Sequence, residues 1–421
     1  MNGYLIFILC LLVFNYLLNL VVELLNLKEL KTEIPAEYEG YYDEEKYSKS
    51  QSYLRETTRF ELLNATITLP IIIAFICFGG FTWVDQLARS AGGGLILTGL
   101  LFAGILMLLG QIMSLPFSIY STFVIEEKYG FNRTTPKTFI LDLVKGLVMG
   151  GIVGAILLSL IIWFFSAAGP LAWLYCWIAV TLFSIFLIYI YPVVFMPLFN
   201  KFEPLEDGEL KSAINNYADK EGFILKDIFK MDGSKRSSKS NAFFTGFGRN
   251  RRVVLYDTLI ENHSIPELVA VLAHEIGHFK LNHIKKMLVA QIIFMGLMFF
   301  TLSLFLHRAG MYEAFGVDYM ATIGDYAPIY AGLIFFQFLF EPISMLLGLF
   351  VNILSRKHEF EADAFAAETT GESENMITAL KKLTVDNLSN LYPHPLKVFL
   401  EYSHPPVLQR IAAIRKVAAK V

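Results

Sequence analysis

Cysteine and charge are both scarce in this sequence. The 421 residues include 3 cysteines, Cys10, Cys77 and Cys176, and each lies within an apolar run. Cysteines placed in this way suggest neither a disulfide framework nor a Cys-based zinc site, so we expect packing residues. Charged residues make up 17% of the chain and the net charge is −3, with no basic arm and no aromatic-interleaved basic patch. The sequence therefore gives no case for a nucleic-acid partner.

Apolar residues, in contrast, are abundant. They make up 55% of the chain, and the mean hydropathy is +0.51, which is typical of an integral membrane protein. The first apolar run, Tyr4–Leu27, has no Lys or Arg before it and no small-residue cleavage site, so we expect a transmembrane helix rather than a signal peptide. Six further runs are long enough to cross a hydrocarbon core of about 30 Å. They are Leu62–Val84, Leu95–Tyr120, Phe139–Phe165, Leu171–Phe195, Met287–Leu306 and Tyr326–Val351.

The sequence thus predicts a mainly α-helical polytopic membrane protein with about seven spans. Lys and Arg are concentrated in the first, third and fifth loops and in the C-terminal tail, whereas the even-numbered loops hold only Arg89 and Arg308. By the positive-inside rule the odd-numbered loops and the tail face the cytoplasm, across a bacterial plasma membrane or an endoplasmic reticulum membrane. The expected segments are residues 1–195 with five spans, 196–286 as a polar segment, 287–354 with spans six and seven, and 355–421 as a C-terminal helical segment.

Four charged residues, Glu23, Asp142, Lys145 and Glu341, fall within the predicted spans. Charges in contact with lipid cost several kcal/mol each, so we expect these side chains to face protein or a water-filled interior. The alternative for Asp142 and Lys145 is that they neutralise each other one helical turn apart.

The stretch Ile265–Lys280 contains the sequence His-Glu-Ile-Gly-His. Its early proline and apolar helical spacing predict a helix, which places His274 and His278 on one face. Two imidazoles one turn apart are typical of a zinc site, and Glu275 between them is suited to act as the base for an attacking water molecule.

Two histidines leave a zinc site incomplete. His283 follows nine residues after His274, and on a continuous helix it faces away. The longer three-His motif is also absent, because Leu281 stands in place of its glycine and Ile284 in place of its third histidine. A carboxylate from a second helix is the natural third ligand.

The stretch after the seventh span offers that carboxylate. Glu359 and Asp363 lie one turn apart, so Glu359 is suited to bind the metal and Asp363 to orient a ligand imidazole. The alternative is an exposed acidic helix face. Glu361 is expected to point elsewhere, and His358 to be a surface residue.

The polar segment also predicts a β-hairpin. Residues Asn241–Phe247 and Arg252–Tyr256 read as strands around a turn at Gly248–Asn250. A strand edge beside the metal-binding helix could align an extended peptide through main-chain hydrogen bonds. Alternatively, the hairpin only caps the helix.

His404 is a further candidate, because hydrolysis of a peptide needs a donor for the developing oxyanion. The alternative is a histidine that merely precedes a helix whose first position is Pro405.

Several blocks of the sequence resemble one family, the CAAX prenyl endoproteases, which are integral-membrane zinc metallopeptidases that trim the C-termini of prenylated proteins. The blocks are His274-Glu-x-x-His278, Ser355-Arg-x-x-Glu359-x-x-Ala-Asp363, Tyr191-Pro with Pro197-Leu-Phe-Asn200, Asn241-Ala-Phe-Phe-Thr-Gly246, Glu126-Glu-Lys-Tyr-Gly-Phe-Asn132 and Ser403-His-Pro-Pro406. Their occurrence in order along most of the chain is far more specific than the zinc motif alone.

The resemblance implies seven helices around an internal chamber, with a zincin-like metallopeptidase domain and one Zn2+ per chain. It implies that Glu359 is the third zinc ligand, that His404 and Arg410 line the site, and that Asn241 belongs to the substrate-binding part. The expected partners are peptide or protein C-termini, prenylated or not, and the lipid bilayer. Two alternatives remain open: a quality-control protease similar to the smaller heat-shock metallopeptidases, which have fewer spans, and a transporter or scaffold with a structural metal.

Overall fold

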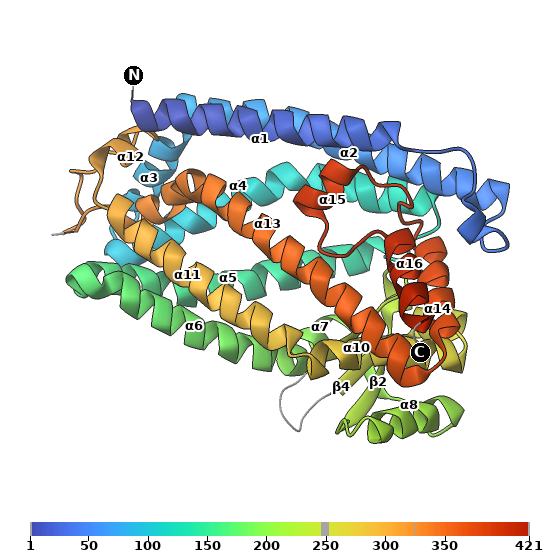
Figure 1. The fold of residues 1–421 in the computed structure, drawn as a ribbon. Coiled ribbons are helices and arrows are strands. Elements are labelled where there is room, and N and C mark those ends of the chain that lie inside the picture. The colour runs from blue at the N-terminus through green and yellow to red at the C-terminus, as the bar shows by residue number, and fades with distance from the viewer. Residues whose placement is uncertain (1, 246–251, 325, 420–421) are drawn as a thin grey trace.

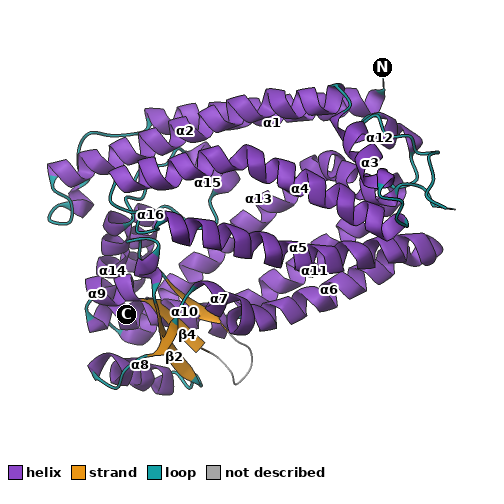
Figure 2. Cartoon of the chain, turned by 180° about the vertical axis from the view of Figure 1, so that it is seen from behind, coloured by secondary structure: helices purple, strands orange, loops and turns teal. Residues whose placement is uncertain are grey.

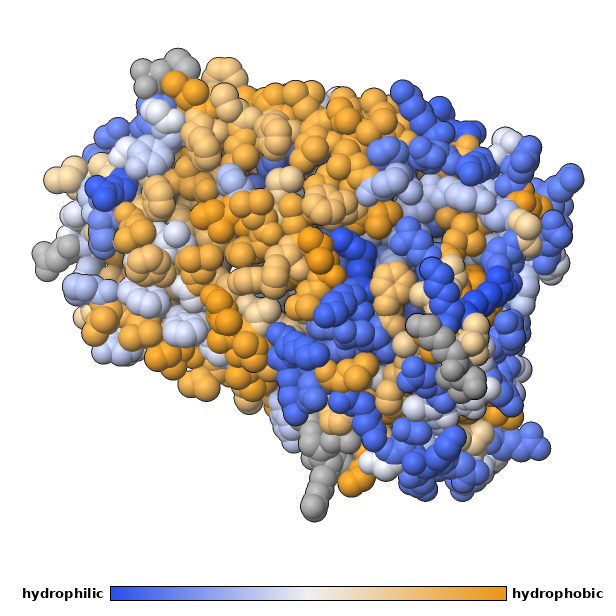
Figure 3. Space-filling view, in the orientation of Figure 1, coloured by the Kyte–Doolittle hydropathy of each residue, from blue (hydrophilic) through white to orange (hydrophobic). Residues whose placement is uncertain are grey.

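Seven long apolar helices form most of the molecule (Figure 1), as the sequence predicts. The computed structural model describes residues 2–245, 252–324 and 326–419. A broad apolar band covers these helices, and polar residues gather at the end where α14 and α16 lie (Figure 3). The spans are α1 (Gly3–Lys28), α2 (Glu44–Cys77), α4 (Leu95–Tyr120) continued by a π-helical segment η2 (Ser121–Glu126), α5 (Pro136–Ala167), α6 (Ala172–Ile190), α11 (His283–Phe305) and α13 (Ile329–Thr370).

Shorter helices connect the spans and build the polar end. At the end of the bundle near the N-terminus lie α3 (Gly80–Ser90) and α12 (Ala309–Glu313), and η3 (Gly169–Leu171) links α5 to α6. At the end of α6, η4 (Tyr191–Phe195) and α7 (Met196–Phe199) lead toward the sheet. Those of the polar end are η1 (Ala36–Tyr38), α8 (Glu209–Lys220), η5 (Gly233–Lys235), α9 (Asp257–Asn262), α10 (Ile265–Lys280), α14 (Ser373–Asp386), α15 (Pro395–Glu401) and α16 (Val407–Ala418).

Two helix ends differ from the expectation. The second apolar run is broken near Gly79, whose φ of 78° ends α2 and lets α3 turn away. The seventh span does not stop at Val351, because the following residues are good helix formers and no breaker occurs before Gly371, whose φ is 70°. The predicted segment boundary at 354/355 therefore falls inside α13, a single helix of 42 residues.

A small mixed sheet lies next to α8 and α10 (Figure 2). Its four strands have the order β1-β2-β4-β3, in which β2 and β4 are parallel and the other pairs antiparallel. The bounds are β1 (Phe202–Pro204), β2 (Asp227–Met231), β3 (Ala242–Thr245) and β4 (Arg252–Tyr256). The pairing of the predicted hairpin is confirmed, with Phe243 opposite Val254. Its predicted turn at Gly248–Asn250 lies outside the described residues.

The buried core has two main parts. One packs the ends of the spans near the N-terminus of α1, where aromatic side chains such as Phe102, Phe315 and Phe335 gather. The other packs the sheet against α10. Between these parts the spans bury few side chains; α6 buries only Ala172 and Cys176 among its described residues.

The structure corrects one expectation, about the cysteines, and one alternative, about Asp142 and Lys145. Cys176 is buried, whereas Cys10 and Cys77 are exposed and do not pack in the core. Asp142 does not pair with Lys145: it forms an ion pair with Arg236, at 2.7 and 2.9 Å between the nitrogen and oxygen atoms. Lys145 instead donates to the Leu198 carbonyl, at 2.6 Å.

Candidate metal centre

The helix α10 presents the predicted metal-binding pair. Its first turn contains Pro266, and the Glu267 carboxylate accepts a hydrogen bond from the Ser264 backbone N–H at 2.8 Å. One face of the helix packs on the sheet through apolar residues such as Leu272 and Ile276. His274 is therefore directed to the other side, toward α13.

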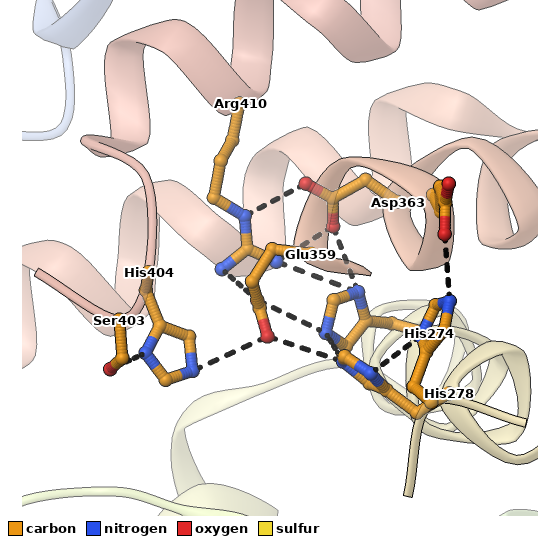
Figure 4. Close-up of polar contacts among 9 residues, drawn as sticks. His274, His278, Glu359, Asp363, Ser403, His404 and Arg410 are labelled. Atoms are coloured by element: carbon orange, nitrogen blue, oxygen red, sulfur yellow. Dashed lines mark hydrogen bonds and ion pairs between the residues drawn. The ribbon is translucent and has the colours of Figure 1, made fainter. Parts of the chain in front are cut away.

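Three ligand atoms converge between α10 and α13 (Figure 4). The His278 Nε2 atom lies 3.2 Å from His274 Nε2 and 3.2 Å from Glu359 Oε1, and His274 Nε2 lies 3.5 Å from Glu359 Oε2. A tetrahedral zinc ion with bonds of about 2.0–2.1 Å holds its ligand atoms roughly 3.3–3.4 Å apart. The Glu359 Oε2 atom is buried and accepts no hydrogen bond from the described residues, although the Arg410 guanidinium lies 3.3 Å away as an ion-pair partner. The group thus fits a cation in both spacing and chemistry.

Asp363 on α13 and Arg410 on α16 support the group from the side opposite His278 (Figure 4). Asp363 Oδ1 lies 2.8 Å from His274 Nδ1, and both Asp363 oxygens accept from the Arg410 guanidinium, at 2.7 and 2.8 Å. Arg410 Nη1 also lies 3.3 Å from Glu359 Oε2. Asp363 therefore occupies the place predicted for the acceptor that orients a ligand imidazole.

The electrostatics of this group follow from its burial. Burial disfavours a charge on His274, but the hydrogen bond to Asp363 outweighs that effect and raises the pKa of the imidazole above its usual value. Burial likewise disfavours the charge on Arg410, yet the Asp363 and Glu359 carboxylates raise the pKa of its guanidinium. The site is therefore strongly attractive to positive charge.

His404 reaches the group from the loop before α16. Its Nε2 atom lies 3.4 Å from Glu359 Oε1, and its Nδ1 atom lies 3.0 Å from the Ser403 hydroxyl. The side chain is 64% exposed, so it faces open space beside the group. His404 does not belong to the ligand atoms that lie within 4.8 Å of one another. The helix itself begins at Val407 rather than at Pro405.

Glu275 and Asn241 lie at the borders of the site. Among the described residues the Glu275 carboxylate has no hydrogen bond or ion pair, so it is free to take a proton. Asn241 is exposed just before β3 and lines a groove of about 650 Å³ together with His404 and Arg410. The structure thus brings all eight residues predicted from the sequence to one region: His274, Glu275, His278, Glu359, Asp363, Asn241, His404 and Arg410.

Two expectations about nearby residues are wrong. His283 does not face away, because α10 ends at Lys280 and the chain turns at Asn282; its Nδ1 atom lies 3.1 Å from His278 Nδ1. His358 is no surface residue: only 3% of it is exposed, and its ring stacks on that of His283 at 4.0 Å.

Sequence reasoning also missed a residue that supports the loop of His404. The Arg356 guanidinium donates to the backbone carbonyls of Val398 and Tyr402, the first at 3.0 Å, and so ties this loop to α13. The only available signal was the position of Arg356 within the block Ser355-Arg-x-x-Glu359.

Comparisons with known proteins agree with this geometry. A family model described as CAAX prenyl protease N-terminal, five membrane helices, matches residues 23–201, and one described as Peptidase family M48 matches residues 204–418. A CAAX prenyl protease 1 homolog of Oryza sativa subsp. japonica is 36% identical over 99% of this chain and 98% of its own. CAAX prenyl protease 1 of Saccharomyces cerevisiae is 35% identical over 93% of this chain and 90% of its own.

A solved structure shows that the whole fold is shared. The crystal structure of S. mikatae Ste24p superposes with a TM-score of 0.93 at 33% sequence identity, covering 98% of this chain and 99% of that chain. Both halves of the sequence, the membrane helices and the segment with the metal-binding group, are thus accounted for by one family. The chain belongs to the CAAX prenyl proteases of peptidase family M48 and is a membrane metalloendopeptidase.

Proposed function

We propose that this protein is a zinc-dependent endopeptidase that cleaves near the C-terminus of CAAX-type prenylated proteins, with its active site on the cytoplasmic side of the membrane. The observation that carries the proposal is the spacing of His274, His278 and Glu359 with Glu275 and His404 beside them. The relatives, which are named CAAX prenyl proteases, support the substrate class.

His274, His278 and Glu359 would hold the zinc, which when bound polarises a peptide carbonyl and lowers the pKa of water. The free carboxylate of Glu275 accepts a proton from the attacking water and passes it to the leaving amine. The Ser403 hydroxyl can donate to His404 Nδ1, which leaves the proton on Nε2. That N–H is then available to the oxyanion that develops on the peptide carbonyl.

The surroundings suit an extended peptide with an apolar end. Among the described strands β3 pairs only with β4, so its other edge is open to an additional strand. The groove of Asn241 adjoins the start of β3. A second pocket of about 340 Å³ adjoins His278; its apolar lining includes Ile188, Ile284 and Met287, and its polar lining includes His283, Gln291, Ser355 and His358.

A cleavage assay tests the proposal. The purified protein is incubated with a farnesylated CAAX peptide, the same peptide without the lipid, and a farnesylated peptide with extra residues after the CAAX box; products are read by mass spectrometry. Release of the last three residues from the first peptide is expected. Preferential cleavage at internal sites of unlipidated peptides would favour a quality-control protease instead.

The variant Glu275→Gln separates a catalyst from a protein with a structural metal. It keeps the three metal-binding side chains, so it should retain zinc while losing turnover. If the unmodified protein cleaves no peptide, and Glu275→Gln does not differ from it in zinc content, the result would support a transporter or scaffold.

A further inference from the structure

A row of three side chains leads from the metal-binding group to the protein surface. His283 Nδ1 lies 3.1 Å from His278 Nδ1, and His283 Nε2 lies 2.9 Å from Glu361 Oε2. The His283 side chain is 2% exposed, whereas that of Glu361 is 36% exposed. His278, which faces the metal position through Nε2, thus contacts a carboxylate on its other side through one intervening imidazole.

The position of His283 is fixed by the local fold. The helix α10 ends at Lys280, and Asn282 then adopts a φ of 59°, which turns the chain. Because α11 begins at His283, the His283 ring is turned back toward His278. On its other face the ring of His358 stacks at 4.0 Å and 9° between planes. Since His358 precedes Glu359 on α13, the same helix that supplies the third ligand also holds this ring.

Counting protons along the row leaves one arrangement. A nitrogen that binds a metal carries no proton, so a neutral His278 has its proton on Nδ1. The acceptor for that N–H is His283 Nδ1, at 3.1 Å, which must then be unprotonated. The proton of a neutral His283 is therefore on Nε2, from which it is donated to Glu361.

We propose that His283 and Glu361 are positioning residues that orient the His278 imidazole and strengthen its binding to zinc. The proposal rests on the proposed function, since it requires that zinc bind. His274 has a direct carboxylate partner in Asp363, at 2.8 Å. His278 receives the same support through His283, and loss of such a partner typically weakens metal binding by about 10–100-fold.

The same proton count argues against a second metal ion held by His283, His358 and Glu361, whose ligand atoms also lie within 4.8 Å of one another. A metal on His283 Nε2 would shift its proton to Nδ1. Two N–H groups would then face each other at the 3.1 Å contact with His278. One zinc ion per chain remains the expected content.

Zinc affinity, measured by competition with a chromophoric chelator, tests the proposal. The variants His283→Phe, which preserves a stacking ring, and Glu361→Gln are expected to weaken zinc binding, the first by about 10–100-fold. Glu368→Gln is the matched control, because it removes the same charge from an exposed position of the same helix. Saturating zinc should restore most of the turnover of Glu361→Gln, since Glu275 and His404 are untouched.

The double variant makes the test specific. If Glu361 acts through His283, then Glu361→Gln added to His283→Phe should cost no further zinc affinity. Additive losses would overturn the proposal, as would a zinc affinity within twofold of the unmodified protein for both single variants. If the unmodified protein bound a second zinc ion and His283→Phe lost that ion, the row would be a second metal site and the proposal would be wrong. Failure of the unmodified protein to bind zinc would instead reject the proposed function itself.

Discussion

The charges of individual residues at the metal-binding group do not balance without a cation. Glu359 and Asp363 are two buried carboxylates, and Arg410 is the cation that contacts both among the described residues, so these three side chains carry one net negative charge when the histidines are neutral. Glu275, which has no ion pair, adds a second negative charge beside them. Buried charges persist in proteins only when they are paired. A divalent cation cancels this excess.

Glu359 should therefore matter more for zinc than any other carboxylate nearby. Glu359→Ala removes a ligand and is expected to leave substoichiometric zinc after dialysis against a weak chelator, measured by atomic absorption. Glu361→Ala is expected to retain zinc under the same conditions, with a lower affinity. It is thus not a neutral control, a role for which Glu368→Gln is better suited. Equal loss from Glu359→Ala and Glu361→Ala would contradict the ligand assignment.

His404 should act on the transition state. Loss of one oxyanion donor typically lowers kcat by about 10²–10³-fold. We expect His404→Ala to show this loss at unchanged zinc content, because its Nε2 atom lies outside the group of ligand atoms. Ser403→Ala is expected to show a smaller loss, since it frees the His404 tautomer without removing the ring. Loss of zinc from His404→Ala would make His404 a ligand instead.

Among the elements, α10 begins with a buried carboxylate that also pairs across to α14. Glu267 is 4% exposed, accepts from the Ser264 N–H, and lies 2.8 Å from Lys382 Nζ. Burial alone would raise the pKa of Glu267, but Lys382 and Ser264 outweigh it and lower the pKa. This capping residue therefore links the start of the metal-binding helix to the C-terminal segment.

We expect Glu267→Gln to lower stability by about 1–3 kcal/mol at neutral pH. Because the folded pKa is lowered, the contribution is fully present above the unfolded pKa of about 4.3 and is lost as the pH falls through the folded value. The unfolding midpoints of the variant and the unmodified protein, measured at pH 7 and below pH 4, should converge in acid. Glu261→Gln, at an exposed position of α9, is the control. A gap that does not shrink in acid would contradict the lowered pKa.

The sequence predicted most helices but few of the interactions between distant segments. The apolar runs marked the seven spans because length and hydropathy are local properties. The strands β1 and β2 were missed, since β1 has 3 residues and β2 pairs with β4 in parallel, from a distant part of the chain. The turn at Asn282 was also missed, although Asn just after a helix is a known stop signal. That omission caused the error about His283.

At the scale of the whole molecule, the spans bury few side chains along their middle. In the most apolar 18-residue stretch of each of these helices, between 0% and 22% of the residues are buried. A solid bundle of seven helices would bury one face of each. Accessible side chains on both faces are expected when helices contact lipid outside and enclose a chamber inside, which supports the chamber that the family resemblance implies.

The orientation of the whole molecule can be measured with introduced cysteines. Ser389 is exposed at the polar end, and Met320, 77% exposed, lies in the loop between α12 and α13. After replacement of Cys10 and Cys77 by serine, an impermeant thiol reagent applied to right-side-out vesicles should label Met320→Cys and not Ser389→Cys. The reverse pattern would place the active site on the opposite side.

The length of the continuous helix α13 also sets the distance between the far end of the bundle and the metal-binding group. Its start is fixed at the far end of the bundle, where Tyr330 donates to Asp85, and Glu359 follows Ile329 after roughly 45 Å of helix at about 1.5 Å per residue. The hydrocarbon core measures about 30 Å. The metal-binding group is thereby held at the polar end of the bundle, farther along the helix than the thickness of the hydrocarbon core.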